Sequence, residues 1–292
     1  MSAPPEDLGP LAPGLWRGAG RRLLTDRAAT AALAAIFALI AAAIIGPHVN
    51  PNRFDAIDWG NIAVGPSLRH AHWLGTDRLG RDLFVRTLLG TRISLAIGLV
   101  ATSVSLAVGI VYGAVAGFAG GRVDHLMMRV IEILSGLPLI FFVILLTVVF
   151  GRNLLLLFVS IGAIGWLTMA RIVRGQAMVL RGREFIEAAV AGGAGPARII
   201  FRHIVPNVIG PVIVYATLTV PQMILFESFL SFLGLGVQEP QASLGTLIAE
   251  GAAEMESAPW MLLVPGVVLA ILLISFNVLG DALRDALDVK EH

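Results

Sequence analysis

The sequence predicts an all-α integral membrane protein with about six transmembrane helices. Hydrophobic residues fill 57% of the 292 positions and charged residues only 14%, and the mean hydropathy is +0.83. Soluble domains average about 25% charged residues, so this chain carries too few charges to cover a water-exposed surface. Apolar runs long enough to cross a bilayer also recur along it. We therefore take lipid to be its solvent.

The first apolar run covers 28–46 and follows a polar segment, 1–27, that carries four arginines. At about 1.5 Å per residue this run extends roughly 28 Å, which is close to the hydrocarbon thickness of a bilayer. A cleaved signal peptide has a shorter apolar core of about 7–15 residues. We therefore predict a retained first transmembrane helix.

Five further apolar runs predict a five-helix core within 93–281, after an extracytoplasmic loop at 47–92 and before a cytoplasmic tail at 282–292. These runs cover 93–117, 130–150, 154–173, 207–233 and 259–280. The very short connection at 151–153 predicts a tight hairpin between the third and fourth spans.

The distribution of basic residues sets the expected orientation. With the N-terminus inside, the cytoplasmic segments hold 14 of the 21 basic residues. The 47–92 loop opposes this orientation with six arginines, whereas the 234–258 loop supports it with four glutamates and no basic residue. We predict that both termini are cytoplasmic.

Several chemistries are excluded by missing residues. The net charge of +1 gives no electrostatic basis for binding nucleic acid, and the absence of cysteine excludes disulfides and thiolate metal sites. No Walker-type phosphate loop and no H-E-x-x-H zinc motif occurs. His70 and His72 lack an evident third ligand, so we expect a solvated loop there and no metal. A polytopic intramembrane enzyme would need paired aspartates or a Ser/His site within its spans, and we find none.

The segment 176–206 predicts a hairpin at the membrane surface. A helix over 176–191 should end at Gly192 and Gly193, where a left-handed C-cap conformation costs little. Pro196 suits the first turn of a second helix, and Pro206 marks the start of the next transmembrane helix.

Charged and small side chains give this hairpin two possible roles. Glu184 and Glu187 lie on its first arm, and Arg198 and Arg202 share one face of the second arm at i, i+4 spacing. Ala188 and Ala189 leave a small surface beside Glu187. The hairpin could enter a groove on a partner protein, or it could lie as an amphipathic helix in the membrane interface. The residues alone leave both roles open.

The same segment resembles the signature of the membrane subunits of binding-protein-dependent ABC importers, E-A-A-x-x-x-G followed after nine residues by I-x-L-P. Glu187-Ala188-Ala189 and Gly193 match this pattern, and Pro206 falls at the required spacing. His203 replaces the usual Ile, and Val205 replaces the Leu. The resemblance implies the type I importer permease fold, with this hairpin as the coupling helix that docks on an ATPase subunit.

Three other stretches resemble the C-type subunit of dipeptide, oligopeptide and nickel permeases, so the likeness extends over most of the chain. They are 72–95, 227–243 and 259–288. The resemblance implies a homologous B-type permease subunit, two ATPase subunits that bind ATP and Mg²⁺, and an extracytoplasmic substrate-binding protein. This chain would then be a non-catalytic permease for di- or oligopeptides in the bacterial plasma membrane, with nickel or another small solute as the alternative cargo. A passive channel or scaffold is the rival outside this class, and it would need no docking hairpin.

The residues before the second span predict an amphipathic helix on the outer surface. Thr76 or Asp77 can cap its N-terminus. Asp77 with Arg81 and Asp82 with Arg86 form i, i+4 pairs. The apolar residues expected on one face of this helix are Leu79, Leu83, Phe84 and Leu88.

Polar and kinked positions within the spans are candidates for the pathway or its gate. A carboxylate at Glu227 within the fifth apolar run costs about 2–4 kcal/mol in hydrocarbon, so it must face protein, water or a partner. It could line the pathway or form a hydrogen bond between helices. Gly136 and Pro138 should break the third span, and Pro211 and Pro221 the fifth. Glu132 can pair with Arg129.

Overall fold

The computed structural model describes residues 15–67, 72–151 and 154–287 of the chain, and within them it is helical, as predicted. Two isolated β-bridges, Ser67 with His72 and Thr76 with Asp82, are the only strand pairing among these residues. The helices are α1 (Leu15–Thr25), α2 (Arg27–Val49), α3 (Leu83–Ala119), α4 (Gly121–Gly136), α5 (Leu139–Phe150), α6 (Leu154–Arg181), α7 (Glu184–Ala191), α8 (Pro196–Ile199), the π-helical turn η1 (Ile200–Ile204), α9 (Val205–Phe232), α10 (Leu244–Ala253) and α11 (Trp260–Leu287).

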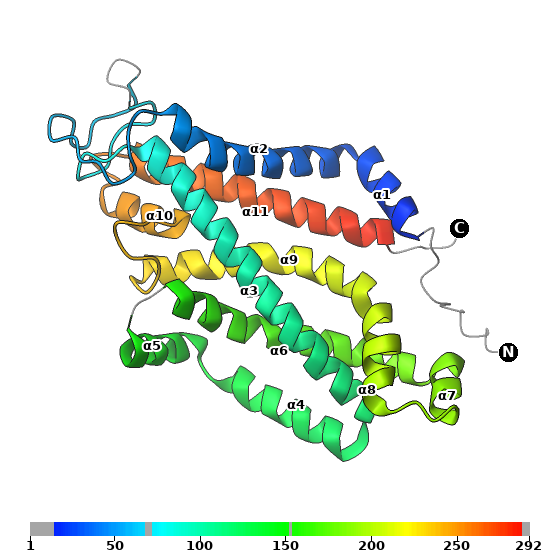
Figure 1. Cartoon of the computed structure of the whole chain (residues 1–292). Helices are drawn as coiled ribbons and strands as arrows, with labels where there is room; N and C mark the ends of the chain where they lie inside the picture. The colour runs from blue at the N-terminus through cyan, green and yellow to red at the C-terminus, as the bar shows by residue number, and fades with distance from the viewer. Residues whose placement is uncertain (1–14, 68–71, 152–153, 288–292) are drawn as a thin grey trace.

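The long helices form one elongated bundle. In Figure 1, α3 runs diagonally across α6 and α9, which are its main packing partners, while α11 lies between α2 and α9. Helices α4 and α5 form the edge of the bundle away from α2. One end of the bundle carries the 50–82 loop and α10, and we call it the loop end. The other carries α1, α7 and α8, and we call it the hairpin end.

Four of the described helical segments are long and apolar enough to cross a membrane, and a fifth candidate is the pair α4 and α5 taken as one bent span. The four are α2, α3, the continuous helix from Pro196 to Phe232, and α11. The predicted span at 154–173 lies in α6, which is a 28-residue helix but is not among these candidates. The predicted 151–153 connection lies partly outside the described residues.

The predicted breaks in the spans are only partly correct. The third span is interrupted at Gly136 and Pro138, where α4 and α5 meet at a bend of 83°. Pro211 and Pro221, in contrast, lie inside an uninterrupted α9, so the prediction that they break the fifth span is wrong. In a membrane bundle, neighbouring helices and side chains can accommodate the backbone carbonyl that a proline leaves without its hydrogen bond.

The predicted amphipathic helix before the second span is also wrong. Residues 76–82 form a turn closed by the bridge between Thr76 and Asp82, and α3 begins directly after it. Asp82, rather than Thr76 or Asp77, caps α3 by accepting a hydrogen bond from the Val85 N–H. Leu83 and Leu88 both belong to the long helix α3 and are buried inside the protein.

Candidate functional site

The hairpin at 176–206 is built differently from its prediction, although its bend is where we expected it. The first arm is not one helix over 176–191, because α6 ends at Arg181 and α7 begins at Glu184. The second arm is the start of one helix that continues through η1 into α9, so Pro206 lies in the first turn of α9 without any preceding gap. Pro196 occupies the first turn of α8, as predicted.

Gly193 forms the bend through its backbone conformation. Its φ of +77° is left-handed, a region that glycine adopts without steric cost. The Ala194 N–H donates to the Ala189 carbonyl at 3.0 Å, and the Gly193 N–H donates to the Val190 carbonyl at 2.9 Å. These two bonds form a Schellman motif, which satisfies the last carbonyls of α7 and directs the chain towards α8.

Buried isoleucines fix the hairpin to the bundle. Ile186 of α7, Ile199 of α8 and Ile204 of η1 are buried in one cluster with Val173 and Ala177 of α6. A displacement of the hairpin would therefore be felt by the long helices α6 and α9 that pack against it. The hairpin is a rigid extension of the bundle rather than a loose loop.

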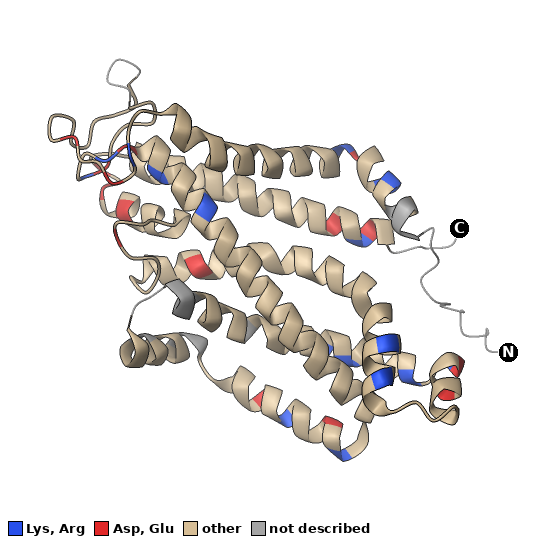
Figure 2. Cartoon of the chain, in the orientation of Figure 1, with Lys and Arg blue, Asp and Glu red and all other residues tan. Residues whose placement is uncertain are grey.

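The opposite side of the hairpin is exposed and charged. Figure 2 shows acidic residues on α7 and basic residues on α8 at the hairpin end. Among the described residues, no ion pair joins these glutamates to these arginines, so their charges remain available to a partner. The exposed predicted residues are Glu184, Glu187, Ala188, Gly193, Arg198, Arg202 and Pro206, and Ala189 is half-buried.

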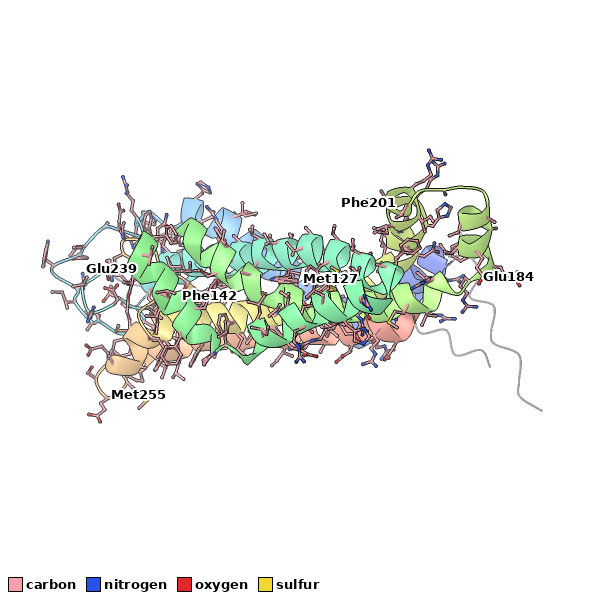
Figure 3. All side chains as sticks on the ribbon, turned by 90° about the horizontal axis from the view of Figure 1, so that it is seen from below. Met127, Phe142, Glu184, Phe201, Glu239 and Met255 are labelled. Atoms are coloured by element: carbon pink, nitrogen blue, oxygen red, sulfur yellow. The ribbon has the colours of Figure 1, made fainter. Side chains whose placement is uncertain are left out.

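Sequence reasoning missed two apolar side chains on this surface. Phe201 is 59% exposed and lies between Arg198 and Arg202 in sequence, and Val190 on α7 is also exposed. Figure 3 shows Glu184 and Phe201 at the same end of the molecule, on the two arms of the hairpin. The position of Phe201 between two arginines that share one face of the second arm was the available signal.

The three gate candidates lie apart. Glu227 is fully buried in α9, where it accepts hydrogen bonds from Ser94 of α3 at 3.1 Å and from Ser231 at 2.6 Å. Pro221 is buried two turns earlier in α9, whereas Pro138 is exposed at the α4–α5 bend. Within this chain, Glu227 therefore acts as a hydrogen-bonding link between helices.

Ser94 and Ser231 extend this link to α10. Ser94 Oγ accepts from the Leu244 N–H at 3.1 Å, and Ser231 Oγ lies 3.2 Å from Ser243 Oγ. Ser243 is the N-cap of α10 and forms a capping box with Thr246. Glu227 thus holds the start of α10 against α3 and α9.

The loop end contains a buried ion-pair network that sequence reasoning found only in part. The predicted pair Asp77–Arg81 is present, with Nε to Oδ2 at 2.6 Å. The predicted pair Asp82–Arg86 is not, because Arg86 bonds Asp77 and also Glu250 of α10, at 2.9 Å. Arg81 extends the network to Glu239 at 3.2 Å. The pairing neutralises two arginines of the 47–92 loop, which weakens their opposition to the predicted orientation.

Asp77 is held ionised by this network. Burial alone would raise the pKa of its carboxyl, but the Arg86 charge, the Arg81 backbone N–H and the Arg81 guanidinium together lower that pKa below its ordinary value. The network therefore ties the 76–82 turn to α3 and α10 with charges that persist at neutral pH.

His72 is part of this packing, so the prediction of a solvated loop is wrong for it. Its side chain is buried, with Nδ1 2.8 Å from Asp82 and Nε2 3.3 Å from Asp58. Hydrogen bonds from Asn61, His72 and Gly60 lower the pKa of Asp58. His70 lies outside the described residues. Within the part of the chain that the structure describes, no cluster of three metal-ligating side chains occurs.

The comparison with known families matches both parts of the chain. Residues 109–291 match the model described as "Binding-protein-dependent transport system inner membrane component", and residues 14–66 match the "N-terminal TM domain of oligopeptide transport permease C". The first match covers more than half of the chain. The chain belongs to the binding-protein-dependent transport family.

Close relatives of this permease are similar over nearly their whole length. The "Oligopeptide transport system permease protein OppC" of Haemophilus influenzae is 50% identical over 95% of this chain and 89% of its own. The Escherichia coli K12 protein of the same name is 51% identical over 95% of this chain and 92% of its own. The "Dipeptide transport system permease protein DppC" of Bacillus subtilis is 44% identical over 93% of this chain and 85% of its own.

The family and these relatives establish the role of the chain as a whole. It is a multi-pass inner membrane protein and the permease subunit of a transport system, and the passive scaffold is set aside. The names of the relatives refer to oligopeptides and dipeptides, which does not favour the nickel alternative.

Proposed function

We propose that this permease moves di- or oligopeptides inward across the plasma membrane, driven by partner ATPases that grip its hairpin. The observation that carries the proposal is the hairpin itself: an acidic and basic surface that is exposed on one side and buried through Ile186 and Ile199 on the other. An exposed surface with unpaired charges can bind a partner, and its rigid base can transmit the partner's motion.

The assignment of the hairpin end to the cytoplasm rests on charge. Both α1 and α8 at this end carry arginines, whereas residues 234–258 at the loop end include four glutamates and no basic residue (Figure 2). Because cytoplasmic segments of membrane proteins are enriched in Lys and Arg, the termini and the hairpin lie inside. The loop end then faces an extracytoplasmic substrate-binding protein.

The complete transporter contains this subunit, a homologous B-type permease subunit, two ATPase subunits and the binding protein. ATP and Mg²⁺ bind to the ATPases, because this chain has no phosphate loop of its own. Of the hairpin residues, Glu187 makes a polar contact in the ATPase groove and Ala188 with Ala189 allows close approach. Arg198 and Arg202 extend the contact from the second arm.

Coupling follows from the difference between two states of the ATPase pair. Closure of the ATPases on ATP draws the two permease hairpins together, and α6 and α9 carry that motion through the membrane to open the pathway outward. Hydrolysis releases the hairpins and restores the inward-facing state. A ligand shifts a conformational equilibrium only through its different affinity for the two states, and here the hairpin contact supplies that difference.

Two substitutions in the hairpin test this proposal. Glu187→Lys reverses an exposed charge, and Gly193→Val places a β-branched residue at positive φ, which costs about 1–2 kcal/mol. Both variants should insert normally, because neither changes a membrane-facing residue. We expect each to lose at least about tenfold in peptide uptake and to co-purify with less ATPase, which corresponds to about 1.4 kcal/mol of docking free energy.

Matched controls separate docking from folding. Glu256→Lys makes the same charge reversal at the loop end, and Gly195→Ala adds a methyl group at negative φ with no atom within 4 Å. Both should retain the ATPase. Normal uptake and normal ATPase recovery in Glu187→Lys and Gly193→Val would remove the coupling role of the hairpin.

A further inference from the structure

A charged cavity lies between α4 and α6, on the edge of the bundle away from α2. Its volume is about 500 Å³. The lining residues are Asp124, His125, Met128, Arg129, Glu132, Arg171 and Arg174. Their spacing explains why they meet: the five from α4 recur at three- and four-residue intervals along one face, and the two arginines from α6 lie three residues apart.

One ion pair joins the α4 wall of the cavity to the α6 wall. Arg174 binds Asp124 through two bonds, with Nε to Oδ1 at 2.5 Å and Nη2 to Oδ2 at 2.6 Å. Arg129 pairs with Glu132 at 3.0 Å, as predicted from the sequence. Each carboxylate of the cavity is therefore already matched by an arginine.

Arg171 is the third arginine, and its neighbour is neutral. Its Nη2 donates to the Ser135 hydroxyl at 2.8 Å, and its side chain is exposed. A guanidinium carries five N–H donors in a planar fork that suits a carboxylate. Arg171 thus adds a positive charge that no acidic residue of the cavity lining neutralises.

The position of this cavity requires water or protein around it. Helix α4 is half of the bent candidate span, and charged side chains inside a span face the bundle interior or a water-filled passage. Exposed apolar residues flank it, including Leu126 and Ile133 on α4 and Phe141 on α5. A second membrane subunit covering this apolar surface would enclose the charges and leave the cavity as a wet passage.

We propose that this cavity is the inner part of the peptide pathway and that Arg171 binds the C-terminal carboxylate of the passing peptide. The proposal deepens the proposed peptide transport and rests on it. The lining holds three arginines and two carboxylates, and this surplus of positive charge at Arg171 suits the carboxylate end of a peptide. The cavity, rather than the buried Glu227, is the polar surface that this chain offers to a substrate.

The test uses the absence of cysteine from the chain. An Arg171→Cys variant is assembled with its partner subunits in lipid vesicles and then modified with one of two methanethiosulfonate reagents. One reagent adds a trimethylammonium group, which restores the positive charge, and the other adds a sulfonate, which reverses it. Uptake of a peptide that the unmodified complex transports is then measured.

We expect the sulfonate adduct to transport at least about tenfold more slowly than the trimethylammonium adduct, and Arg171→Lys to keep most of the wild-type rate. The matched control is Arg122→Cys, at an exposed position in the first turn of α4 outside the cavity. Its peptide uptake should be the same after modification with either reagent. Equal uptake by the two Arg171→Cys adducts would overturn the proposal.

A second experiment distinguishes a peptide carboxylate from an anionic lipid headgroup as the ligand of Arg171. The comparison is repeated in vesicles of phosphatidylcholine alone, where a pathway residue keeps its charge effect. If the difference between adducts disappears there, the cavity binds lipid and the proposal is wrong. If the unmodified complex transports no peptide in either vesicle, the proposed function itself fails.

Discussion

Asp77 organises the loop end although it lies in a turn. Its two oxygens accept from the Leu79 and Arg81 N–H groups and from the Arg81 and Arg86 guanidinium groups. Arg86 is fully buried and continues the contact to Glu250 of α10. A single carboxylate thus fixes the turn, the start of α3 and a helix more than 160 residues later.

Replacing this carboxylate should destabilise the loop end strongly. Asp77→Asn keeps the size of the side chain but leaves two buried guanidinium groups with less negative charge, and breaking a buried pair costs about 3–5 kcal/mol. We expect a lower Tm for the purified protein and retained helical content. Arg53→Gln, which removes a pair on the exposed surface of the same loop, should change Tm little because such pairs contribute about 0–1 kcal/mol.

The pH dependence of this effect follows from the lowered pKa of Asp77. A carboxyl with a depressed pKa contributes stability above its unfolded-state value, near 3.8, and that stability is lost as pH falls through the lower folded value. The Tm difference between wild type and Asp77→Asn should therefore stay constant from about pH 5 to about pH 8. A difference that shrinks within this window would show that Asp77 is not held ionised.

At the scale of the element, the contact between α3 and α6 depends on a row of glycines. Gly109, Gly113 and Gly117 recur every fourth residue on α3. A Cβ at Gly113 would meet the Ala170 carbonyl of α6 at 2.4 Å, and one at Gly117 would meet the Arg174 carbonyl at 2.6 Å. Small residues at such spacing let two membrane helices approach through their backbones.

A larger residue in this row should separate α3 from α6. We expect Gly113→Val to lower stability by about 1–3 kcal/mol, because an overpacked interface must shift its backbones. The measurement is the Tm of the detergent-solubilised protein. Gly175→Ala is the control, since this α6 glycine has no neighbour within 4 Å, and it should be neutral or slightly stabilising. Equal Tm values for both variants would contradict the close α3–α6 contact.

The elements show where sequence reasoning succeeds and where it fails. The bend at Gly193 could be predicted because a helix C-cap is a local signal. The spans could be predicted because every segment that crosses lipid must be apolar. The prediction of a separate helix before α3 failed because the i, i+4 spacing of Asp82 and Arg86 was taken as a local pair. Asp82 instead binds His72 and caps α3, and Arg86 instead binds Glu250. Partners far apart in sequence cannot be read from spacing, and neither can the α4–α6 cavity.

At the scale of the whole molecule, the hairpin end and the loop end have different surfaces. The hairpin end offers exposed charges on a rigid base, and the loop end offers a surface held by buried ion pairs, with Trp59 77% exposed. A transporter driven by an intracellular motor needs the first surface inside and the second outside. The proposed function therefore depends on the orientation of the chain in the membrane.

Labelling of single cysteines tests this orientation directly, because the natural chain has none. Glu187→Cys places a thiol on the exposed face of α7, and Trp59→Cys places one on the loop at the opposite end. A maleimide that cannot cross the membrane should label Trp59→Cys in spheroplasts and Glu187→Cys only in inside-out vesicles. Cytoplasmic segments of membrane proteins carry an excess of Lys and Arg, so the reverse labelling pattern would mean that charge does not set the topology of this chain. It would also place the hairpin beyond the reach of any cytoplasmic ATPase, and the coupling mechanism would have to be abandoned.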